Sequence, residues 1–253
     1  MLASSVVVTG AGSGIGRAVV LACARRGANV AALDVDADLA DAVAAEALRA
    51  GAGLAIGLGC DVTGEVSVRQ AYDDVEARLG GFDAVCANAG IEVNAPLHTF
   101  QLEPWKRVIE VNLVGVFLTC REALGRLVTR AAGGSIVCTS SPAAFVGFSG
   151  GGNSAYAASK GGVSAFVRSA AVDYARYGIR VNAVVPGATD TPMLLASDET
   201  HLAAKAQIPL GRLGQPEEIA AAIVWLLSSE ASYVTGAHLV CDGGLMAKSA
   251  NDF

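Results

Sequence analysis

The sequence has few charged residues and no cluster of positive charge. Charged residues make up 17% of the 253 residues, and the formal net charge is −6. The 18 basic residues are scattered along the chain, whereas a nucleic-acid site needs them gathered along one surface. We therefore expect no nucleic-acid partner. Because 53% of the residues are hydrophobic, the chain is also too apolar for a disordered protein.

Histidine is scarce, and cysteine occurs without the short spacings of metal sites. The 3 histidines, His98, His201 and His238, are far apart in the sequence. None of the 6 cysteines belongs to a C-x-x-C pair, and most of them lie in apolar segments. We therefore predict no metal site, and we interpret the cysteines as buried, reduced thiols.

The chain lacks a recognisable export signal or membrane span. Its first residues, MLASSVVVTG, contain no basic segment and lead directly into a glycine motif. A long uncharged run, residues 131–159, contains clustered Gly, Ser and Pro, which would leave backbone groups without partners in lipid. We expect a cytoplasmic protein with no membrane partner.

Short apolar runs alternate with segments of helical periodicity along the whole sequence. SSVVVTG precedes GIGRAVVLACARRG, and the alternation continues to a final apolar run, AHLVCDGG. Such alternation predicts an α/β Rossmann fold, with a doubly wound, mostly seven-stranded parallel sheet and helices on both faces. No linker or repeat interrupts the pattern, so we predict a single domain over residues 1–253.

The motif TGAGSGIG, residues 9–16, follows the first predicted strand and opens the first predicted helix. Glycines allow the backbone to approach a pyrophosphate, and free N–H groups at the helix N-terminus meet its charge. We therefore predict a dinucleotide-binding loop. An ordinary tight turn is the alternative. The candidate contact residues of the loop are Gly10, Ser13, Gly14, Ile15 and Gly16.

Asp34 ends the second predicted strand. A carboxylate there can accept hydrogen bonds from both hydroxyls of an adenosine ribose, and it would repel a 2′-phosphate. Ser13 and Val35 offer no positive charge to bind such a phosphate. We therefore predict NAD as the cofactor. A solvated turn aspartate is the alternative.

Tyr156 and Lys160 stand one helical turn apart near the start of a predicted helix, so their side chains share one face. A neighbouring ammonium and a positive nicotinamide ring both favour the phenolate, and we expect them to lower the tyrosine pKa from about 10. The two residues taken alone are equally compatible with a solvated surface pair.

Several features, in order along the chain, resemble the short-chain dehydrogenase/reductase family over essentially the full length: TGAGSGIG, Asp34, CDV, NAG, Asn112, YAASK and VVPGATDTP. The resemblance implies that Tyr156 exchanges the substrate hydroxyl proton and that Lys160 also holds the nicotinamide ribose. It further implies that Asn112 bends its helix and holds a water in a proton relay. An exposed polar residue is the alternative for this asparagine.

The family also carries a serine at the end of the strand before this helix, where its hydroxyl bonds the substrate oxygen. CTSSPAA supplies two candidates, and we choose Ser141 over Ser140. The interval from Ser141 to Tyr156 is slightly longer than the common family spacing. A small insertion within VGFSGGGN is therefore expected, and Ser140 stays open as the alternative.

The resemblance implies further cofactor contacts, for which ordinary turn structure is the alternative. Those near the adenine are Asp61, Val62, Asn88, Ala89 and Gly90, and those near the nicotinamide are Pro186, Gly187, Thr189 and Thr191. A substrate loop is expected at about residues 188–212. The segment DGG, residues 242–244, resembles a subunit contact of the family, and we predict a homotetramer.

These expectations define an oxidoreductase that transfers a hydride between NAD(H) and a secondary alcohol or ketone, with Tyr156 as general acid and base. A reductase of a C=C or C=N bond and a catalytically silent NAD-binding sensor are the alternatives. The predicted substrate lining favours a mostly apolar, ring-shaped molecule: Glu92, Pro142, Phe145, Phe148, Asn153, Met193, Leu194 and Leu195. Glu92 either pairs with a cationic group or faces solvent.

Overall fold

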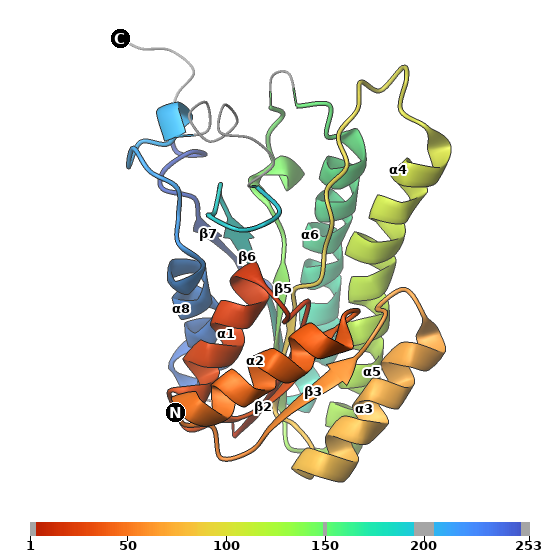
Figure 1. Ribbon diagram of the computed structural model, residues 1–253, viewed down its shortest axis with the longest axis vertical. Coiled ribbons are helices and arrows are strands. Elements are labelled where there is room, and N and C mark those ends of the chain that lie inside the picture. The colour runs from red at the N-terminus through yellow and green to blue at the C-terminus, as the bar shows by residue number, and fades with distance from the viewer. Residues whose placement is uncertain (1–3, 149–150, 195–204, 249–253) are drawn as a thin grey trace.

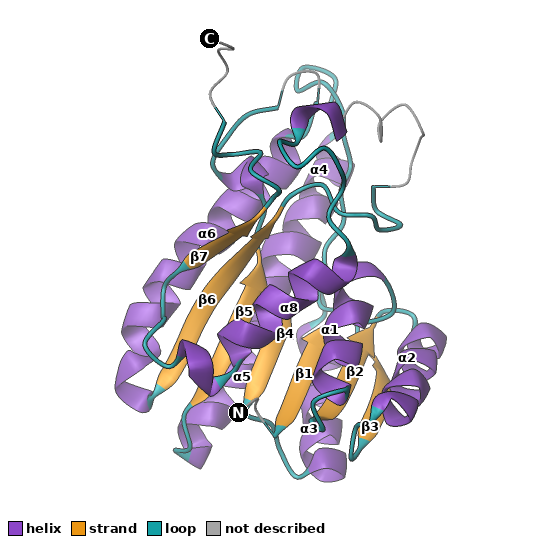
Figure 2. Ribbon diagram, turned by 90° about the vertical axis from the view of Figure 1, so that its left-hand side faces the viewer, coloured by secondary structure: helices purple, strands orange, loops and turns teal. Residues whose placement is uncertain are grey.

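Seven parallel strands form one sheet in the order β3-β2-β1-β4-β5-β6-β7 (Figure 2). The structure is a computed structural model, and it describes residues 4–148, 151–194 and 205–248. The strands are β1 (Ser5–Thr9), β2 (Asn29–Asp34), β3 (Ala55–Gly59), β4 (Ala84–Ala87), β5 (Gly134–Thr139), β6 (Ile179–Pro186) and β7 (His238–Cys241). The predicted α/β Rossmann architecture is confirmed.

Helices cover both faces of this sheet (Figure 1). Among them are α1 (Gly14–Ala24), α2 (Ala37–Ala50), α3 (Glu65–Leu79), α4 (Leu102–Ile109), α5 (Gly115–Arg130), α6 (Ser154–Tyr174) and α8 (Pro216–Leu227). Helices α1, α2 and α8 pack on one face, and α3, α5 and α6 pack on the other. Each strand therefore needs apolar side chains on both sides, which explains why the strands read as unbroken apolar runs.

Strand β1 illustrates how the side chains divide between the two faces. Val6 and Val8 belong to the core under α1 and α8, and Val7 belongs to the core under α3, α5 and α6. All three side chains are fully buried. The carboxyl ends of the strands meet at one edge, where the order reverses between β1 and β4, and α/β sheets bind ligands at this kind of edge.

The uncharged run of residues 131–159 forms β5, a short 3-10 turn (Pro142–Ala144) and the first residues of α6. None of the helices within residues 4–148, 151–194 and 205–248 combines the length and apolarity needed to cross a membrane. The run contributes to the end of the sheet where the carboxyl ends of the strands meet and where the site lies.

The long helical region predicted around Asn112 is one helical path with an irregular turn. Between α4 and α5 the backbone widens into a π-helical turn over Glu110–Val114. Such turns are rare and are frequently found at functional sites. Here the side chain that turns inward is Asn112, which is fully buried.

Candidate active site

A cavity of about 650 Å³ opens at the carboxyl ends of the strands. Most of the predicted site residues line it: Gly10, Ser13, Gly14, Ile15, Asp34, Asp61, Val62, Asn88, Ala89, Gly90, Ser141, Tyr156, Lys160, Pro186, Gly187, Thr189 and Thr191. Two predicted site residues, Gly16 and Asn112, are not among the residues that line the cavity. The cavity thus brings together residues that are as far apart in sequence as Gly10 and Thr191.

The loop between β1 and α1 has the tight geometry that only glycine permits. Gly10 has φ +62°, and a Cβ on it would lie 2.8 Å from the Cα of Ala89. A Cβ on Gly16 would lie 2.0 Å from the carbonyl oxygen of Gly10. Helix α1 begins at Gly14, so its free N–H groups face the cavity. These residues fit the pyrophosphate of a dinucleotide.

Asp34 lies at the end of β2, with its carboxylate fixed by two backbone donors. The N–H of Gly12 donates to Oδ2 at 2.8 Å, and the N–H of Asp36 donates to Oδ1 at 3.1 Å. Val35, next to it, is 73% exposed and adds no charge. The carboxylate keeps free lone pairs on the wall of the cavity, as a ribose site requires.

Two threonines that the sequence analysis did not single out hold the strand ends together. The hydroxyl of Thr9 accepts hydrogen bonds from the N–H groups of Asn88 at 3.1 Å and Ala89 at 3.2 Å. The hydroxyl of Thr139 donates to the side-chain oxygen of Asn88 at 3.1 Å. A hydroxyl residue at the last position of two nearby strands was the available signal.

The structure separates the two candidate serines. The hydroxyl of Ser140 lies 2.7 Å from that of Ser164 and 3.4 Å from the carbonyl oxygen of Lys160, so it points under α6. Ser141 caps the 3-10 turn, where its hydroxyl accepts from the N–H of Ala143 at 3.2 Å and also bonds the Tyr156 side chain. The geometry therefore favours Ser141 as the partner of Tyr156.

Tyr156 is partly buried near the start of α6, facing the cavity. Burial raises its pKa to about 12, the charge of Glu92 acts in the same direction, and the hydrogen bond with Ser141 acts against both. The protein's own groups therefore do not lower the pKa of Tyr156 as the sequence analysis expects. Desolvation of the phenolate has the larger effect.

Lys160 lies one turn further along α6 and is 3% exposed. Its Nζ donates to the carbonyl oxygen of Thr139 at 2.7 Å and lies 5.6 Å from the centre of the Tyr156 ring. Burial lowers the pKa of Lys160 to about 8. The ammonium is thus held beside the phenol, as the spacing of the two residues predicts, and with a pKa of about 8 it stays mostly protonated at neutral pH.

Asn112 connects the π-helical turn to the site. Its side-chain oxygen accepts from the N–H of Ile91 at 2.8 Å, and its amide donates to the carbonyl of Ile91 at 2.9 Å and to the hydroxyl of Ser159 at 3.1 Å. A Cβ on Gly90 would lie 3.3 Å from the Asn112 oxygen and 3.5 Å from the Lys160 nitrogen. Asn112 and Lys160 therefore flank the same glycine.

The predicted substrate lining holds in part. Glu92, Pro142, Phe148, Asn153, Met193 and Leu194 line the cavity. The prediction for Phe145 is wrong, because the turn at Pro142–Ala144 directs its ring against His238, with 5.6 Å between ring centres. Leu195 belongs to residues 195–204, the part of the predicted loop outside the described residues, whereas Gln207 and Ile208 line the cavity from the end of that loop.

The segment DGG lies against the end of β6. A Cβ on Gly187 would lie 2.6 Å from the Cα of Asp242, and the Asp242 carboxylate accepts from the N–H groups of Gly244 and Met246, both at 2.8 Å. Its role in a subunit contact stays a prediction. Across residues 4–148, 151–194 and 205–248, no group of three or more potential ligand residues is arranged for a metal ion, and His201 lies outside these ranges.

The chain is similar to proteins of one family along almost its whole length. A family profile described as enoyl-(acyl carrier protein) reductase matches residues 10–246. A short-chain type dehydrogenase/reductase from Mycobacterium marinum shares the fold with a TM-score of 0.94 and 36% identity, over 97% of this chain and 96% of that one. The chain belongs to the short-chain dehydrogenase/reductase family.

Two curated relatives of this short-chain dehydrogenase/reductase are named after ring alcohols. The cis-4-hydroxycyclohexanecarboxylate dehydrogenase of Sinomonas cyclohexanicum is 48% identical, over 95% of this chain and 96% of the relative. The 2,5-dichloro-2,5-cyclohexadiene-1,4-diol dehydrogenase of Sphingobium indicum is 39% identical, over 96% of this chain and 97% of the relative. Both relatives are dehydrogenases that act on CH–OH groups, which supports the same enzyme class for this chain.

Solved members of the family hold nicotinamide cofactors of both kinds. A gluconate 5-dehydrogenase from Burkholderia cenocepacia, in complex with NADP and tartrate, is 31% identical with a TM-score of 0.89, over 97% of this chain and 96% of that one. A 3-ketoacyl-(acyl-carrier-protein) reductase from Brucella melitensis, complexed with NADH, is 30% identical with a TM-score of 0.89, over 96% and 98%. The family thus uses NAD(P)(H).

Proposed function

We propose that the protein oxidises a secondary alcohol on a small apolar ring, with NAD as the acceptor. The observation that carries this proposal is the grouping of Tyr156, Ser141 and Lys160 in one cavity whose substrate end is mostly apolar. The ring alcohols in the names of the two curated relatives support the same substrate class.

The roles of the three side chains follow from their positions. NAD, when bound between the glycine loop and Lys160, supplies the acceptor for the hydride of the carbinol carbon. The Ser141 hydroxyl bonds the substrate oxygen and the phenol together, and Tyr156 takes the hydroxyl proton. Because burial raises the pKa of Tyr156 to about 12, the proton transfer needs the positive charge of Lys160 beside it.

Lys160 and Asn112 provide the onward path for the proton. The pKa of Lys160, lowered by burial to about 8, lies near neutral pH, where an acid or base exchanges protons most effectively. The Asn112 side chain is fixed by Ile91 and Ser159, so a water on its free face would be oriented toward the Lys160 ammonium.

The central experiment compares the wild type with Tyr156→Phe in NADH formation from cyclohexanol. We expect kcat/KM to fall by about a thousandfold, the middle of the range for loss of a general acid and base, while NADH binding measured by fluorescence is retained. Tyr233→Phe is the matched control, because Tyr233 is fully exposed. Full activity of Tyr156→Phe would remove the tyrosine from the mechanism.

The same assay separates the alternatives. A silent sensor would bind NADH without oxidising any alcohol. The family profile carries the name of an enoyl reductase, so consumption of NADH with an enone, and none with a ketone, would favour reduction of a C=C bond.

Asp34 is proposed to select NAD over NADP. We expect the wild type to favour NAD by about a hundredfold in kcat/KM, since a buried like-charge contact costs several kcal/mol. In Asp34→Asn that preference should shrink, whereas Asp38→Asn, which changes an exposed acid in the first turn of α2, should keep it. An unchanged preference in Asp34→Asn would contradict the assignment.

We also propose that the protein assembles as a homotetramer, with residues 242–244 near a subunit contact. Light scattering of the purified protein tests this directly. A monomer at micromolar concentration would contradict it.

A further inference from the structure

Glu92 lies on the segment after β4 and lines the same cavity as Tyr156. Its Oε1 accepts a hydrogen bond from the side-chain amide of Asn94 at 3.1 Å, and Asn94 lines the cavity too. No lysine or arginine in the described part of the chain forms an ion pair with Glu92. The bond from Asn94 therefore orients the carboxylate without balancing its charge.

The charged side chains that the described residues place around the cavity fall into two groups. Asp34, Asp61 and Arg107 stand at the end where the cofactor's adenosine is expected, and the Arg107 guanidinium donates to Thr63 at 3.3 Å. Glu92 and Lys160 stand at the reacting end. Because the Lys160 ammonium is buried and directed at Thr139, Glu92 is the charge there that a substrate substituent can meet.

The described parts of the neighbouring substrate loop, residues 188–194 and 205–212, offer no positive charge in compensation. Lys205 is exposed and does not line the cavity, and both terminal nitrogens of Arg212 bond Glu218 at 2.7 Å. Among the residues that the structure describes, a substrate carboxylate would thus find Glu92 near the reacting end and no free cation.

Glu92 acts on the reacting groups themselves. Burial has the largest effect on the pKa of both Tyr156 and Lys160, and the negative charge of Glu92 acts to raise each of them. The carboxylate is therefore close enough for its charge to be felt where the substrate hydroxyl must lie.

We propose that Glu92 makes the enzyme select substrates by their charge. Ring alcohols bearing a protonated amine are preferred to neutral ones, and neutral ones are preferred to those bearing a carboxylate. This inference rests on the proposed function. Glu92 is exposed at the cavity, so an ammonium would pair with it in contact with solvent, near side chains such as Phe148 and Met193 that also line the cavity. A carboxylate would meet a like charge, so the preference proposed here differs from that of the Sinomonas relative, whose named substrate carries a carboxylate.

The first test measures kcat/KM of the wild type and Glu92→Gln for cyclohexanols substituted at carbon 4 with an amino, a methyl or a carboxylate group. The ratio between substrates is the readout, because any change at Tyr156 affects all three alike. We expect Glu92→Gln to raise the carboxylate-to-methyl ratio about tenfold and to lower the amino-to-methyl ratio similarly. Glu103→Gln, an exposed acid on α4, matches the change of net charge and should leave both ratios unaltered.

Charge reversal and a binding measurement make the result decisive. Glu92→Lys should favour the carboxylate substrate over the amino one. Calorimetric binding of cyclohexylamine and cyclohexanecarboxylate to the NADH-loaded enzyme tests the same preference without turnover. Equal or reversed binding by the wild type, or ratios that do not respond to Glu92→Gln, would overturn the inference. Preference for the amine without alcohol oxidation would instead support Glu92 and contradict the proposed function.

Discussion

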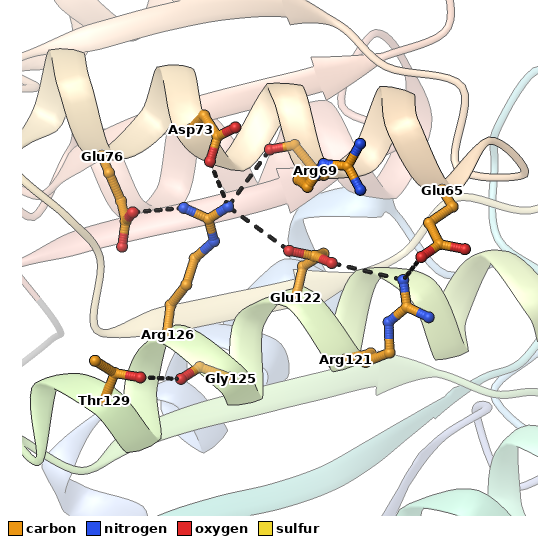
Figure 3. Close-up of polar contacts among 9 residues, drawn as sticks. All are labelled: Glu65, Arg69, Asp73, Glu76, Arg121, Glu122, Gly125, Arg126 and Thr129. Atoms are coloured by element: carbon orange, nitrogen blue, oxygen red, sulfur yellow. Dashed lines mark hydrogen bonds and ion pairs between the residues drawn. The ribbon is translucent and has the colours of Figure 1, made fainter.

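The protein holds two desolvated cations in opposite ways. Arg126 on α5, 15% exposed in its side chain, is surrounded by carboxylates: Asp73 at 2.7 Å and Glu76 at 2.5 Å from α3, and Glu122 at 3.6 Å from its own helix (Figure 3). Lys160 is more deeply buried, and its nitrogen meets one carbonyl oxygen. In the described ranges no carboxylate forms an ion pair with Lys160.

The two pKa values respond accordingly. Partial burial pulls the pKa of Arg126 down, but the hydrogen bonds and charges of Asp73 and Glu76 outweigh it, and the pKa lies above its usual value. Burial alone lowers the pKa of Lys160 to about 8, against weaker opposing effects. The cation that holds helices together is balanced by acids, whereas the one proposed to act in catalysis is left unbalanced.

The largest effect is expected for Lys160→Met. Activity should fall by about a thousandfold, because Tyr156 loses the charge that favours its phenolate. The free energy of unfolding should nevertheless rise by about 1–3 kcal/mol, because an unbalanced buried charge is replaced by an apolar side chain. Urea titration measures this, with the exposed Lys106→Met as control. A loss of stability in Lys160→Met would break the contrast with Arg126.

The two serines extend the contrast to neutral groups. Ser141→Ala should lower kcat/KM by about a hundredfold, as expected for loss of one donor to the reacting oxygen. Ser140→Ala should keep kcat within a few fold and lower the free energy of unfolding by about 1 kcal/mol, because Ser164 loses its partner. Steady-state kinetics and urea titration of both variants check the pair. Equal kinetic defects would contradict the separation.

Arg126→Met should lower the stability of the fold and leave activity unchanged, the reverse of what is expected for Lys160→Met. Removing the guanidinium leaves three acids close together, and we expect the free energy of unfolding to fall by about 2 kcal/mol with kcat unchanged. Arg121→Met is the matched control, since Arg121 is 38% exposed and pairs mainly with Glu65 at 2.8 Å (Figure 3). A loss of about 0.5 kcal/mol is expected there.

An effect on stability that is spread over more than two pH units sharpens the comparison. Below about pH 8 the buried Lys160 is charged in both the folded and unfolded states, and above about 10.5 it is neutral in both. Between these values the unfolded state binds more protons, so stability rises with pH. The difference in free energy of unfolding between the wild type and Lys160→Met should therefore shrink, by up to about 3 kcal/mol across the window. A constant difference would show that burial does not shift this lysine.

Most of the fold was predictable because the strands are buried on both faces and therefore stand out as short apolar runs. The glycine loop, Asp34 and the spacing of Tyr156 and Lys160 were found for a similar reason, since each depends on residues near in sequence. In β5, Ile136 and Cys138 face the α6 side, and the same alternation carried one step further predicts that Ser140 points under α6.

The remaining features depend on contacts between distant segments. Phe145 was misplaced because the turn before it sends its ring toward His238. The pKa of Tyr156 could not be read from Lys160 alone, because it depends on how deeply the phenol is buried. The part that Thr9 plays is set by Asn88 and Ala89, which directly follow another strand, β4.

The wide turn between α4 and α5 has a consequence for the evolution of the site. Residues of an α-helix follow each other at about 100° around the axis, so one extra residue in a turn resets the orientation of everything after it. Asn112 can thus point inward while α5 keeps Cys120 and Leu124 against the sheet. Deleting a single residue from Glu110–Val114 would rotate that whole apolar stripe away from its partners, so insertions and deletions there should be far less tolerated than point changes.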